Sequence, residues 1–303
     1  MGLIFLFFQS ILNSKAVFTE KIMKNLGYYN GKFDEIENMY IPMGDRVCHF
    51  GDGVYDATYS RNFVIHDLAA HIDRLFDSAE ALNITPPCSK EKLDSILQDM
   101  LKLMDTGNNF IYFQITRGTN PKRSHAFGVE PPKSNLWINI RPEEIDDTYQ
   151  KVKLITLEDT RFLHCNIKTL NLLPAVMATQ KAQEKGCFEA VLHRNGRVTE
   201  CSHSNVHILK NGSFITAPLD NLILPGVTRR HLIELCQNLS IPVEERPFSV
   251  DEMMAADEVF ISAVGTFAIS ASEIDGVPVG GKAPELLKKL QHGLLNEFIA
   301  STN

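Results

Sequence analysis

Apolar residues recur every three or four positions in two stretches of the first half of the chain. A helix turns once every 3.6 residues, so each stretch would bury one of its faces against a core. The apolar positions are Leu68, Ile72, Leu75, Ala79 and Leu82 in the first stretch and Leu93, Ile96, Met100, Leu101 and Met104 in the second. Further helices are predicted from about 172 to 185, with Gly186 as the stop, from about 228 to 239, and after Pro284.

Four Asn-Gly or Asp-Gly pairs separate runs of apolar residues. A two-residue hairpin turn of type I′ needs positive φ at both central residues, and these pairs adopt it at little steric cost. The pairs are Asn30-Gly31, Asn195-Gly196, Asn211-Gly212 and Asp275-Gly276. Strands are therefore expected beside these pairs, for example over 190–193 and 206–209.

Helices and strands are mixed along the chain without the regular order of a parallel α/β protein. This mixture favours an α+β fold with mainly antiparallel or mixed sheets and packed helices. A polar stretch over 141–147 follows the apolar strand expected at 136–140, and it is the best candidate for a linker. The chain is therefore predicted to form a small domain over 23–141, a linker over 142–148 and a larger domain over 149–303.

The composition is that of an ordinary globular protein. Of the 303 residues, 44% are hydrophobic and 22% are charged, which excludes a disordered or collagen-like chain. The formal net charge of −7 argues against a general nucleic-acid binder, which needs a basic surface to compete for phosphates. Any site for an anion must therefore depend on a few local cationic groups.

Six cysteines lie far apart in the sequence, at positions 48, 88, 165, 187, 201 and 236. The sequence has no Cys-x-x-Cys motif and no paired cysteine and histidine spacing of a zinc site, so no metal site is expected. Scattered reduced thiols are typical of a reducing compartment, and we expect the protein in the cytoplasm.

The first 22 residues differ in character from the rest of the chain. Residues 1–12 form an apolar run that is too short to span a bilayer as a helix. Met23 is a second candidate start just before a predicted strand and turn, which favours an extension over 1–22 that the folded protein does not need. A signal sequence is the alternative, although no Lys or Arg precedes the apolar run.

Three motifs follow one another in the second half of the chain. Ile-Lys-Thr-Leu-Asn spans 167–171, Val-Thr-Glu-x-Ser-x-Ser-Asn spans 198–205 and Leu-Pro-Gly-Val-Thr-Arg spans 224–229. With these motifs the sequence resembles the fold-type IV pyridoxal-phosphate enzymes, and among them the D-amino acid aminotransferases. The resemblance extends from about Gly27 to near the C-terminus. It implies two domains with pyridoxal 5′-phosphate in the cleft between them, and a homodimer.

Lys168 and Glu200 carry the chemistry that this resemblance implies. Lys168 would bind pyridoxal phosphate as a Schiff base and then move a proton between substrate and cofactor, because only a primary amine forms that imine. Its apolar neighbours, Ile167 and Leu170 among them, argue against an ordinary surface lysine. Glu200 would face the pyridine nitrogen and keep it protonated, so that the ring withdraws electrons from the reacting carbon.

Three segments are candidates for binding the cofactor phosphate. A Pro-Gly pair leads into a predicted helix, whose backbone N–H groups at Val227 and Thr228 would point at the phosphate together with the Thr228 hydroxyl. Arg74 matches the phosphate-binding arginine of the family, and its guanidinium suits bidentate contact with phosphate oxygens. Gly265 and Thr266 occupy the second phosphate turn, where the typical D-amino acid enzyme has a Ser/Thr-rich stretch.

Substrate binding is expected from a second group of residues. Tyr55 follows a Phe-Gly-Asp-Gly motif of the family, and the loop at 112–125 resembles one that reaches across the dimer to hold the substrate carboxylate. Tyr55, Arg123 and His125 would form this carboxylate site, and the side on which they hold the carboxylate selects the enantiomer. The loop is one residue longer than the typical Pro-Arg-x-His sequence, so Lys122 is a competing candidate.

The expected reaction is transamination of a D-amino acid, such as D-alanine or D-glutamate, with a 2-oxo acid such as pyruvate or 2-oxoglutarate. A branched-chain L-amino acid aminotransferase is favoured by the Gly-Thr turn and opposed by Arg123 and His125, which that family lacks. An aminodeoxychorismate lyase would share Lys168 and Glu200. A non-catalytic protein that retains the fold is the remaining alternative. We expect no nucleic-acid and no membrane partner.

Overall fold

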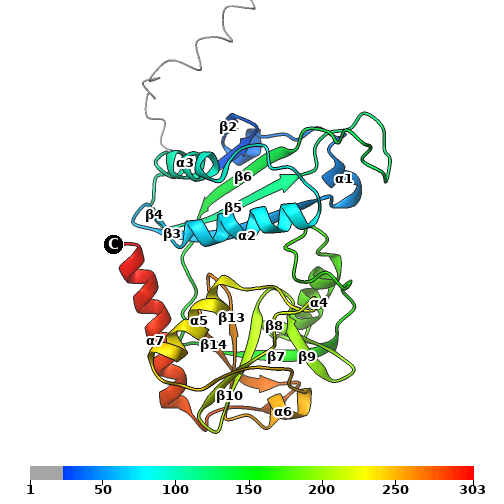
Figure 1. The fold of residues 1–303 in the computed structure, drawn as a ribbon. Coiled ribbons are helices and arrows are strands. Elements are labelled where there is room, and N and C mark those ends of the chain that lie inside the picture. The colour runs from blue at the N-terminus through cyan, green and yellow to red at the C-terminus, as the bar shows by residue number, and fades with distance from the viewer. Residues whose placement is uncertain (1–22) are drawn as a thin grey trace, which may run out of the picture.

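The computed structural model describes residues 23–303, which form two sheets with helices packed around them (Figure 1). The strands of the first sheet come from the first half of the chain, and those of the second sheet come from the second half. Each half has a hydrophobic core of its own. The fold is α+β with two domains, as the sequence predicts. The predictions for residues 1–22 lie outside the described residues.

The first sheet has six strands in the order β2-β1-β6-β5-β3-β4, and each neighbouring pair is antiparallel. Helices α2 (Leu68–Ala81) and α3 (Lys90–Leu101) pack on it, and their buried leucines share a core with Ile111 and Phe113. Two short helices, η1 (Ile36–Asn38) and α1 (Arg46–Phe50), lead from β2 to β3. The strands are β1 (Leu26–Tyr29), β2 (Lys32–Asp34), β3 (Gly53–Arg61), β4 (Val64–Ile65), β5 (Asn109–Thr116) and β6 (Asn135–Pro142).

The second sheet has nine strands and is mixed. Its order is β12-β11-β10-β13-β14-β7-β8-β9, with β15 paired to β14 off this path. The pairs β11–β12, β14–β7 and β7–β8 are parallel. The strands are β7 (Lys151–Glu158), β8 (Glu189–Arg194), β9 (Arg197–Cys201), β10 (Asn205–Lys210), β11 (Ser213–Thr216), β12 (Val243–Glu245), β13 (Glu258–Ser262), β14 (Ile269–Ile274) and β15 (Val277–Pro278). The helices of this half are α4 (Leu173–Glu184), α5 (Val227–Asn238), α6 (Val250–Met254) and α7 (Pro284–Ser301).

All four predicted hairpin turns are confirmed. The first residue of each pair has a φ of +48° to +51°, and the glycine that follows has a φ of +79° to +92°. Each pair joins two antiparallel strands: β1 to β2, β8 to β9, β10 to β11 and β14 to β15. Turn chemistry therefore determines these hairpins locally.

The five predicted helices are confirmed as α2, α3, α4, α5 and α7, with small shifts at their ends. Gly186 has a φ of +66° just after α4, as expected of a residue that ends a helix. The sequence did not predict α1 and α6. Each has five residues, too few for a periodic pattern to be recognised.

The linker and the C-terminal helix α7 both join the two halves. Strand β6 ends at Pro142 and β7 begins at Lys151, so the predicted linker at 142–148 carries the chain from one sheet to the other, and its bounds stay a prediction. The end of α7 returns to the first half, where Ser301 Oγ lies 2.9 Å from His66 Nδ1. Tyr59 of β3 packs in the same cluster as Phe298 of α7, so the two halves are held together by apolar and polar contacts.

None of the helices between residues 23 and 303 combines the length and the apolar character needed to cross a membrane.

Candidate active site

A cavity of about 320 Å³ is lined by residues from both halves of the chain. Its volume is in the range of small-molecule sites. Among the described residues predicted for the site, six line the cavity and four do not. The six are Tyr55, Arg74, Lys168, Glu200, Val227 and Thr228, and the four are Arg123, His125, Gly265 and Thr266.

Lys168 lies in the segment between β7 and α4, and the first half of the chain fixes its backbone. Tyr55 N donates to Lys168 O at 3.0 Å, and Leu170 N donates to Gly53 O at 3.0 Å. Lys168 N donates to Ser78 Oγ of α2 at 3.2 Å. Its Nζ lies 4.4 Å from the centre of the Tyr55 ring, a cation–π contact. The second half of the chain thus supplies the amine of Lys168, and the first half positions it.

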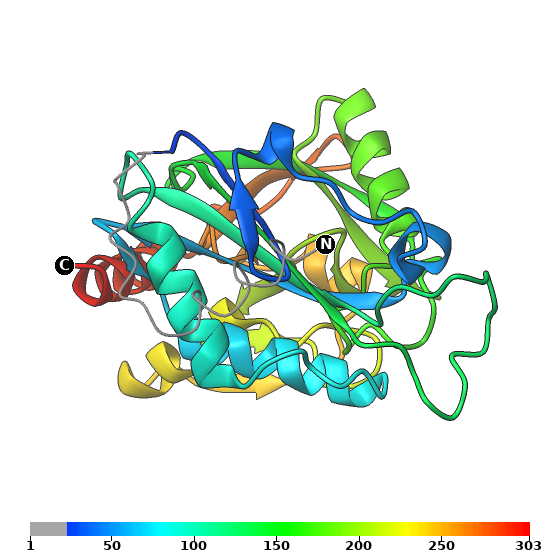
Figure 2. The same cartoon turned by 90° about the horizontal axis from the view of Figure 1, so that it is seen from above.

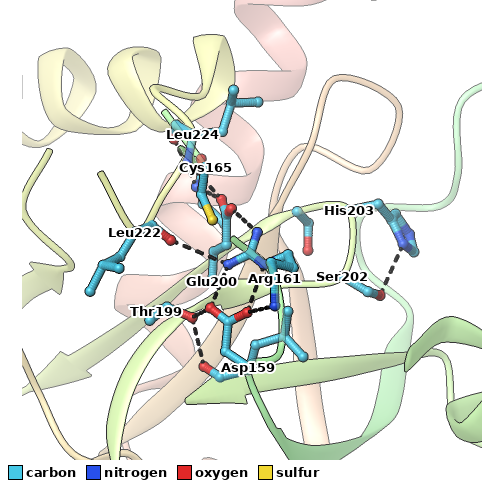
Figure 3. A network of polar contacts seen from close by, with 12 residues as sticks. Asp159, Arg161, Cys165, Thr199, Glu200, Ser202, His203, Leu222 and Leu224 are labelled. Atoms are coloured by element: carbon cyan, nitrogen blue, oxygen red, sulfur yellow. Dashed lines mark hydrogen bonds and ion pairs between the residues drawn. The ribbon is translucent and has the colours of Figure 1, made fainter. Parts of the chain in front are cut away.

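Glu200 lies near the end of β9 with its carboxylate buried (Figure 3). Oε1 forms an ion pair with Arg161 Nη1. Oε2 accepts hydrogen bonds from Asn205 Nδ2 at 3.0 Å and from Leu224 N at 2.9 Å. Burial raises the pKa of Glu200, and the charge and hydrogen bond of Arg161 oppose this shift. The neighbouring donors therefore favour the ionised form and fix its orientation.

Arg161 is a residue of this site that sequence reasoning missed. Its Nη2 donates to Asp159 Oδ2 at 2.9 Å and its Nε donates to Asp159 Oδ1 at 3.0 Å. Burial lowers the pKa of Arg161, but the hydrogen bonds of Asp159 and the charge of Glu200 raise it more. Arg161 stands shortly before Lys168 in the sequence, yet its partner Glu200 follows 39 positions later. The only signal in the sequence is an arginine close to the lysine motif, because the contact between Arg161 and Glu200 forms only when the chain folds.

Arg74 of α2 and the start of α5 line the same cavity. Arg74 Nε and Nη2 donate to the two carboxylate oxygens of Asp56, each at 2.8 Å. In the described part of the chain no side chain caps the first N–H groups of α5, which begins at Val227. A Cβ on Gly226 would come within 2.1 Å of Asn205 Oδ1, so this position requires glycine. A guanidinium and a helix N-terminus together form a site for an anion.

His71 shows that the arrangement fits a bound phosphate. Its side chain is 1% exposed and lines the cavity, and its Nδ1 lies 2.7 Å from Asp56 Oδ1. Its Nε2 is buried with no hydrogen-bond partner in the structure of residues 23–303. Buried polar atoms without a partner are rare, so we expect Nε2 to bind an atom of a ligand. Nδ1 donates to Asp56 and burial lowers the pKa of His71, so Nε2 is an acceptor, and a protonated phosphate oxygen would satisfy it.

The structure does not bring Gly265 and Thr266 to the cavity. Ala263 and Val264 line it instead. Gly265 packs on the ring of Tyr59, where a Cβ would come within 2.7 Å of the ring atoms. Thr266 is buried, and its Oγ1 has no hydrogen-bond partner among the described residues. The turn therefore meets the cavity at Ala263 and Val264, earlier in the sequence than predicted, and Gly265 packs against Tyr59.

Arg123 and His125 lie in the loop between β5 and β6, which extends away from the body of the molecule (Figure 2). The Arg123 guanidinium lies 4.8 Å from the centre of the Phe50 ring, and the His125 ring lies 5.1 Å from it. Arg46 donates to the backbone oxygens of Ser124 and His125 at 2.6 and 3.0 Å. The loop is thus anchored on α1, and within one chain it does not join Tyr55 in the cavity.

Sequence comparison identifies the family. The family described as "Amino-transferase class IV" matches residues 53–274. A D-alanine aminotransferase of Bacillus licheniformis is 37% identical over 276 residues, which are 90% of this chain and 97% of that protein. A D-alanine aminotransferase of Staphylococcus haemolyticus is 32% identical over 277 residues, which are 90% of this chain and 98% of that protein.

Comparison with solved structures supports the same fold. The branched-chain amino acid aminotransferase of Escherichia coli has a TM-score of 0.81 at 22% identity, covering 93% of this chain and 96% of that one. The branched-chain aminotransferase of Thermoproteus uzoniensis, solved with norvaline, has a TM-score of 0.81 at 22% identity, covering 90% and 94%. With the matched sequence family, the chain belongs to the class IV aminotransferases.

Proposed function

We propose that this protein is a pyridoxal-phosphate-dependent aminotransferase that transfers the amino group of a D-amino acid to a 2-oxo acid. The donors are of the D-alanine and D-glutamate type, and the acceptors are pyruvate and 2-oxoglutarate. The observation that carries the proposal is one cavity lined by Lys168, Glu200 and Arg74. Two relatives named D-alanine aminotransferase, at 37% and 32% identity, support the choice of D-amino acids.

The cofactor would be held at both of its ends. Pyridoxal phosphate, when bound, supplies an aldehyde that accepts an amine and a ring that draws electrons from the reacting carbon. Arg74, His71 Nε2 and the backbone N–H groups of Val227 and Thr228 would bind the phosphate. Glu200 would hold the proton on the ring nitrogen, because Arg161 favours its ionised form.

Lys168 would take the proton from the substrate and return it. It is the only lysine that lines the cavity in the described part of the chain. Its backbone bonds to Tyr55 and Ser78 fix where the side chain starts, and Nζ lies over the face of the Tyr55 ring. A base held in this way moves protons between defined positions.

The substrate α-carboxylate would bind to Tyr55 of one chain and to Arg123 and His125 of a second copy. This arrangement explains why Tyr55 lines the cavity while the side chains of Arg123 and His125 lie outside it. A second copy would also cover an apolar face at the start of α4. Four residues there are 39–71% exposed: Leu172, Leu173, Val176 and Met177. Exposed apolar patches of this kind are typical of protein contacts.

The test is optical. The purified protein, loaded with pyridoxal phosphate, should absorb near the visible edge of the spectrum and lose this band when D-alanine is added, but not with L-leucine. The opposite order would favour a branched-chain L-amino acid aminotransferase, and release of pyruvate from aminodeoxychorismate would favour the lyase. A protein that never acquires the band would retain only the fold of the family. Light scattering should give the mass of a dimer.

We also infer that the protein works in the cytoplasm. All six cysteines are free thiols in the structure, and none needs an oxidising compartment for its pairing. Cell fractionation with an antibody against the protein tests this inference, and recovery with secreted proteins would contradict it.

A further inference from the structure

A buried carboxylate, Glu189, holds the turn that follows Glu200. The Glu189 side chain is fully buried. Its Oε1 accepts hydrogen bonds from His203 N at 2.6 Å and from Ser204 N at 3.1 Å, and its Oε2 accepts one from Ser204 Oγ at 2.7 Å. Ser202 Oγ donates the fourth hydrogen bond to this carboxylate, to Oε1 at 3.2 Å. Glu189 therefore fixes a turn in which every residue lines the cavity.

The same carboxylate lies beside the ring of His203. His203 Nδ1 lies 3.2 Å from Glu189 Oε1 and 3.4 Å from Ser202 Oγ. Nδ1 is therefore turned toward these two residues, and Nε2 is the edge of the ring that remains for another partner. The His203 side chain is 51% exposed, so the ring stands at the mouth of the cavity. When Nε2 carries a proton, this edge can donate a hydrogen bond to a carboxylate.

The two arginines and the lysine that line the cavity already have partners or a role. Arg161 is bound to Asp159 and Glu200, and Arg74 is bound to Asp56. Lys168 serves the cofactor under the proposed function. Two exposed histidines remain among the described lining residues.

These two histidines are His203 and His164. His164 precedes Cys165, and its ring lies 6.0 Å from that of Phe162. Figure 3 shows Cys165 and His203 well apart, on different sides of the pair of Arg161 and Glu200. Of these two, His203 is the one whose ring lies beside a buried acid.

The linker lies next to one part of the cavity wall. Burial and Glu143 raise the pKa of Asp146, and the charge of His203 lowers it. Asp146 N donates to Gly265 O at 2.9 Å, which places the linker beside the turn at Val264. Val264, Ala57 and Phe110 line the cavity as well. These apolar residues, together with the imidazole of His203, suit a substrate with a short aliphatic chain that ends in a charged group.

We propose that His203, held by Glu189, binds the distal carboxylate of dicarboxylic substrates and so sets the preference between diacids and monoacids. This inference rests on the proposed function and adds a residue to it. The α-carboxylate is left to Tyr55, Arg123 and His125. An imidazole N–H that donates to a carboxylate forms a charge-assisted hydrogen bond, and its loss corresponds to about a 10- to 100-fold change.

The test compares His203→Gln with the wild-type holoenzyme. The variant should lose about 10- to 100-fold in kcat/KM for D-glutamate and 2-oxoglutarate, and change less than about threefold for D-alanine and pyruvate. The dissociation constant of glutarate, an unreactive diacid, should rise by a similar factor, while that of butyrate stays constant. Asp146→Asn removes a competing charge next to His203, so it should tighten glutarate binding.

His164→Gln is the matched control and should leave both glutarate and butyrate binding unchanged. An equal loss for diacids and monoacids in His203→Gln, or a selective loss in His164→Gln, would overturn the inference. Glutarate binding does not need turnover. A protein that binds glutarate through His203 but converts no D-amino acid would therefore contradict the proposed function and support the role of His203.

Discussion

Arg161 and Glu200 form a buried ion pair inside the cavity, and Asp159 holds Arg161 from the other side (Figure 3). Removing one partner of a buried pair leaves an uncompensated charge, which costs about 3–5 kcal/mol. Arg194 provides a natural comparison, because its Nε bonds to the same Asp159 Oδ2 at 3.1 Å but it has no bond to Glu200 among the described contacts. Variants of the two arginines therefore distinguish the loss of a contact with Asp159 alone from the loss of contacts with both Asp159 and Glu200.

Arg161→Gln should therefore lower stability and activity together. Without the guanidinium, burial raises the pKa of Glu200 unopposed by its main partner, and the neutral acid no longer favours a protonated ring nitrogen. We expect a loss of about 3 kcal/mol in the free energy of unfolding in urea and a fall of kcat by about 100-fold. Arg194→Gln should keep most of kcat. Equal kcat values in the two variants would contradict the role given to Arg161.

Lys168→Ala should abolish transamination and leave a folded protein. The backbone bonds of Lys168 to Tyr55 and Ser78 do not involve the side chain, so the local structure has no reason to change. Circular dichroism should match that of the wild type, and the visible band should be absent after addition of pyridoxal phosphate. Residual turnover above that of the free cofactor would refute the assignment.

Arg123→Ala should raise KM for D-alanine by roughly 10- to 1000-fold, as expected when a charged hydrogen bond to a carboxylate is lost. Lys122→Ala is the matched control from the same exposed loop. If the lysine variant shows the large effect and the arginine variant does not, the extra residue in the loop has moved the carboxylate site. Mixing Arg123→Ala with Lys168→Ala tests the exchange between chains, since a mixed dimer has one cavity with both native residues and should recover activity.

Much of the fold could be predicted because its signals are local. The turn at Asn195-Gly196 depends on two adjacent residues, and α2 follows from apolar positions one helical turn apart. Lys168 and Glu200 were identified from motifs, and the structure brings both to one cavity.

The rest of the site depends on contacts that only folding creates. Arg161 becomes informative when it meets Glu200 across 39 positions of sequence. Gly265 packs against the ring of Tyr59, a residue of the other half, and does not line the cavity. Under the proposed function, Arg123 would act in the cavity of a second copy of the chain. The pattern of a single sequence contains none of these three relationships.

His71→Asn should weaken the binding of pyridoxal phosphate by about 10-fold, because a buried hydrogen bond to the phosphate would be lost. Equilibrium dialysis measures this directly, without reference to turnover. Pyridoxal, which has no phosphate, is the internal control, and its affinity should be the same in variant and wild type. Equal weakening for both compounds would mean that His71 supports the cavity and does not bind the phosphate.

The stability of the contact between the halves should depend on pH through His231. His231 Nε2 lies 2.7 Å from Asp67 Oδ2 and its Nδ1 lies 3.4 Å from Glu297, so it joins α5 to the start of α2 and to α7. The hydrogen bond to Asp67 raises the pKa of His231 above 6.5, against the effect of burial. The folded protein therefore holds this proton more tightly than the unfolded chain, and the stabilisation is complete below pH 6.5 and lost as the pH rises through the folded pKa.

His231→Asn should consequently be less stable than the wild type by roughly 0.5–1 kcal/mol at about pH 6, and the difference should close toward about pH 9. Urea unfolding at a series of pH values measures it. The neighbouring His66 has a pKa lowered to about 4 by burial, so it removes stability as the pH falls below 6.5. Because the charge of His231 contributes to this lowering, the two histidines are coupled below pH 6.5, and the closing of the gap above that pH is the part assigned to His231 alone. A gap that stays constant from acid to alkaline pH would show that His231 acts through packing and not through its charge.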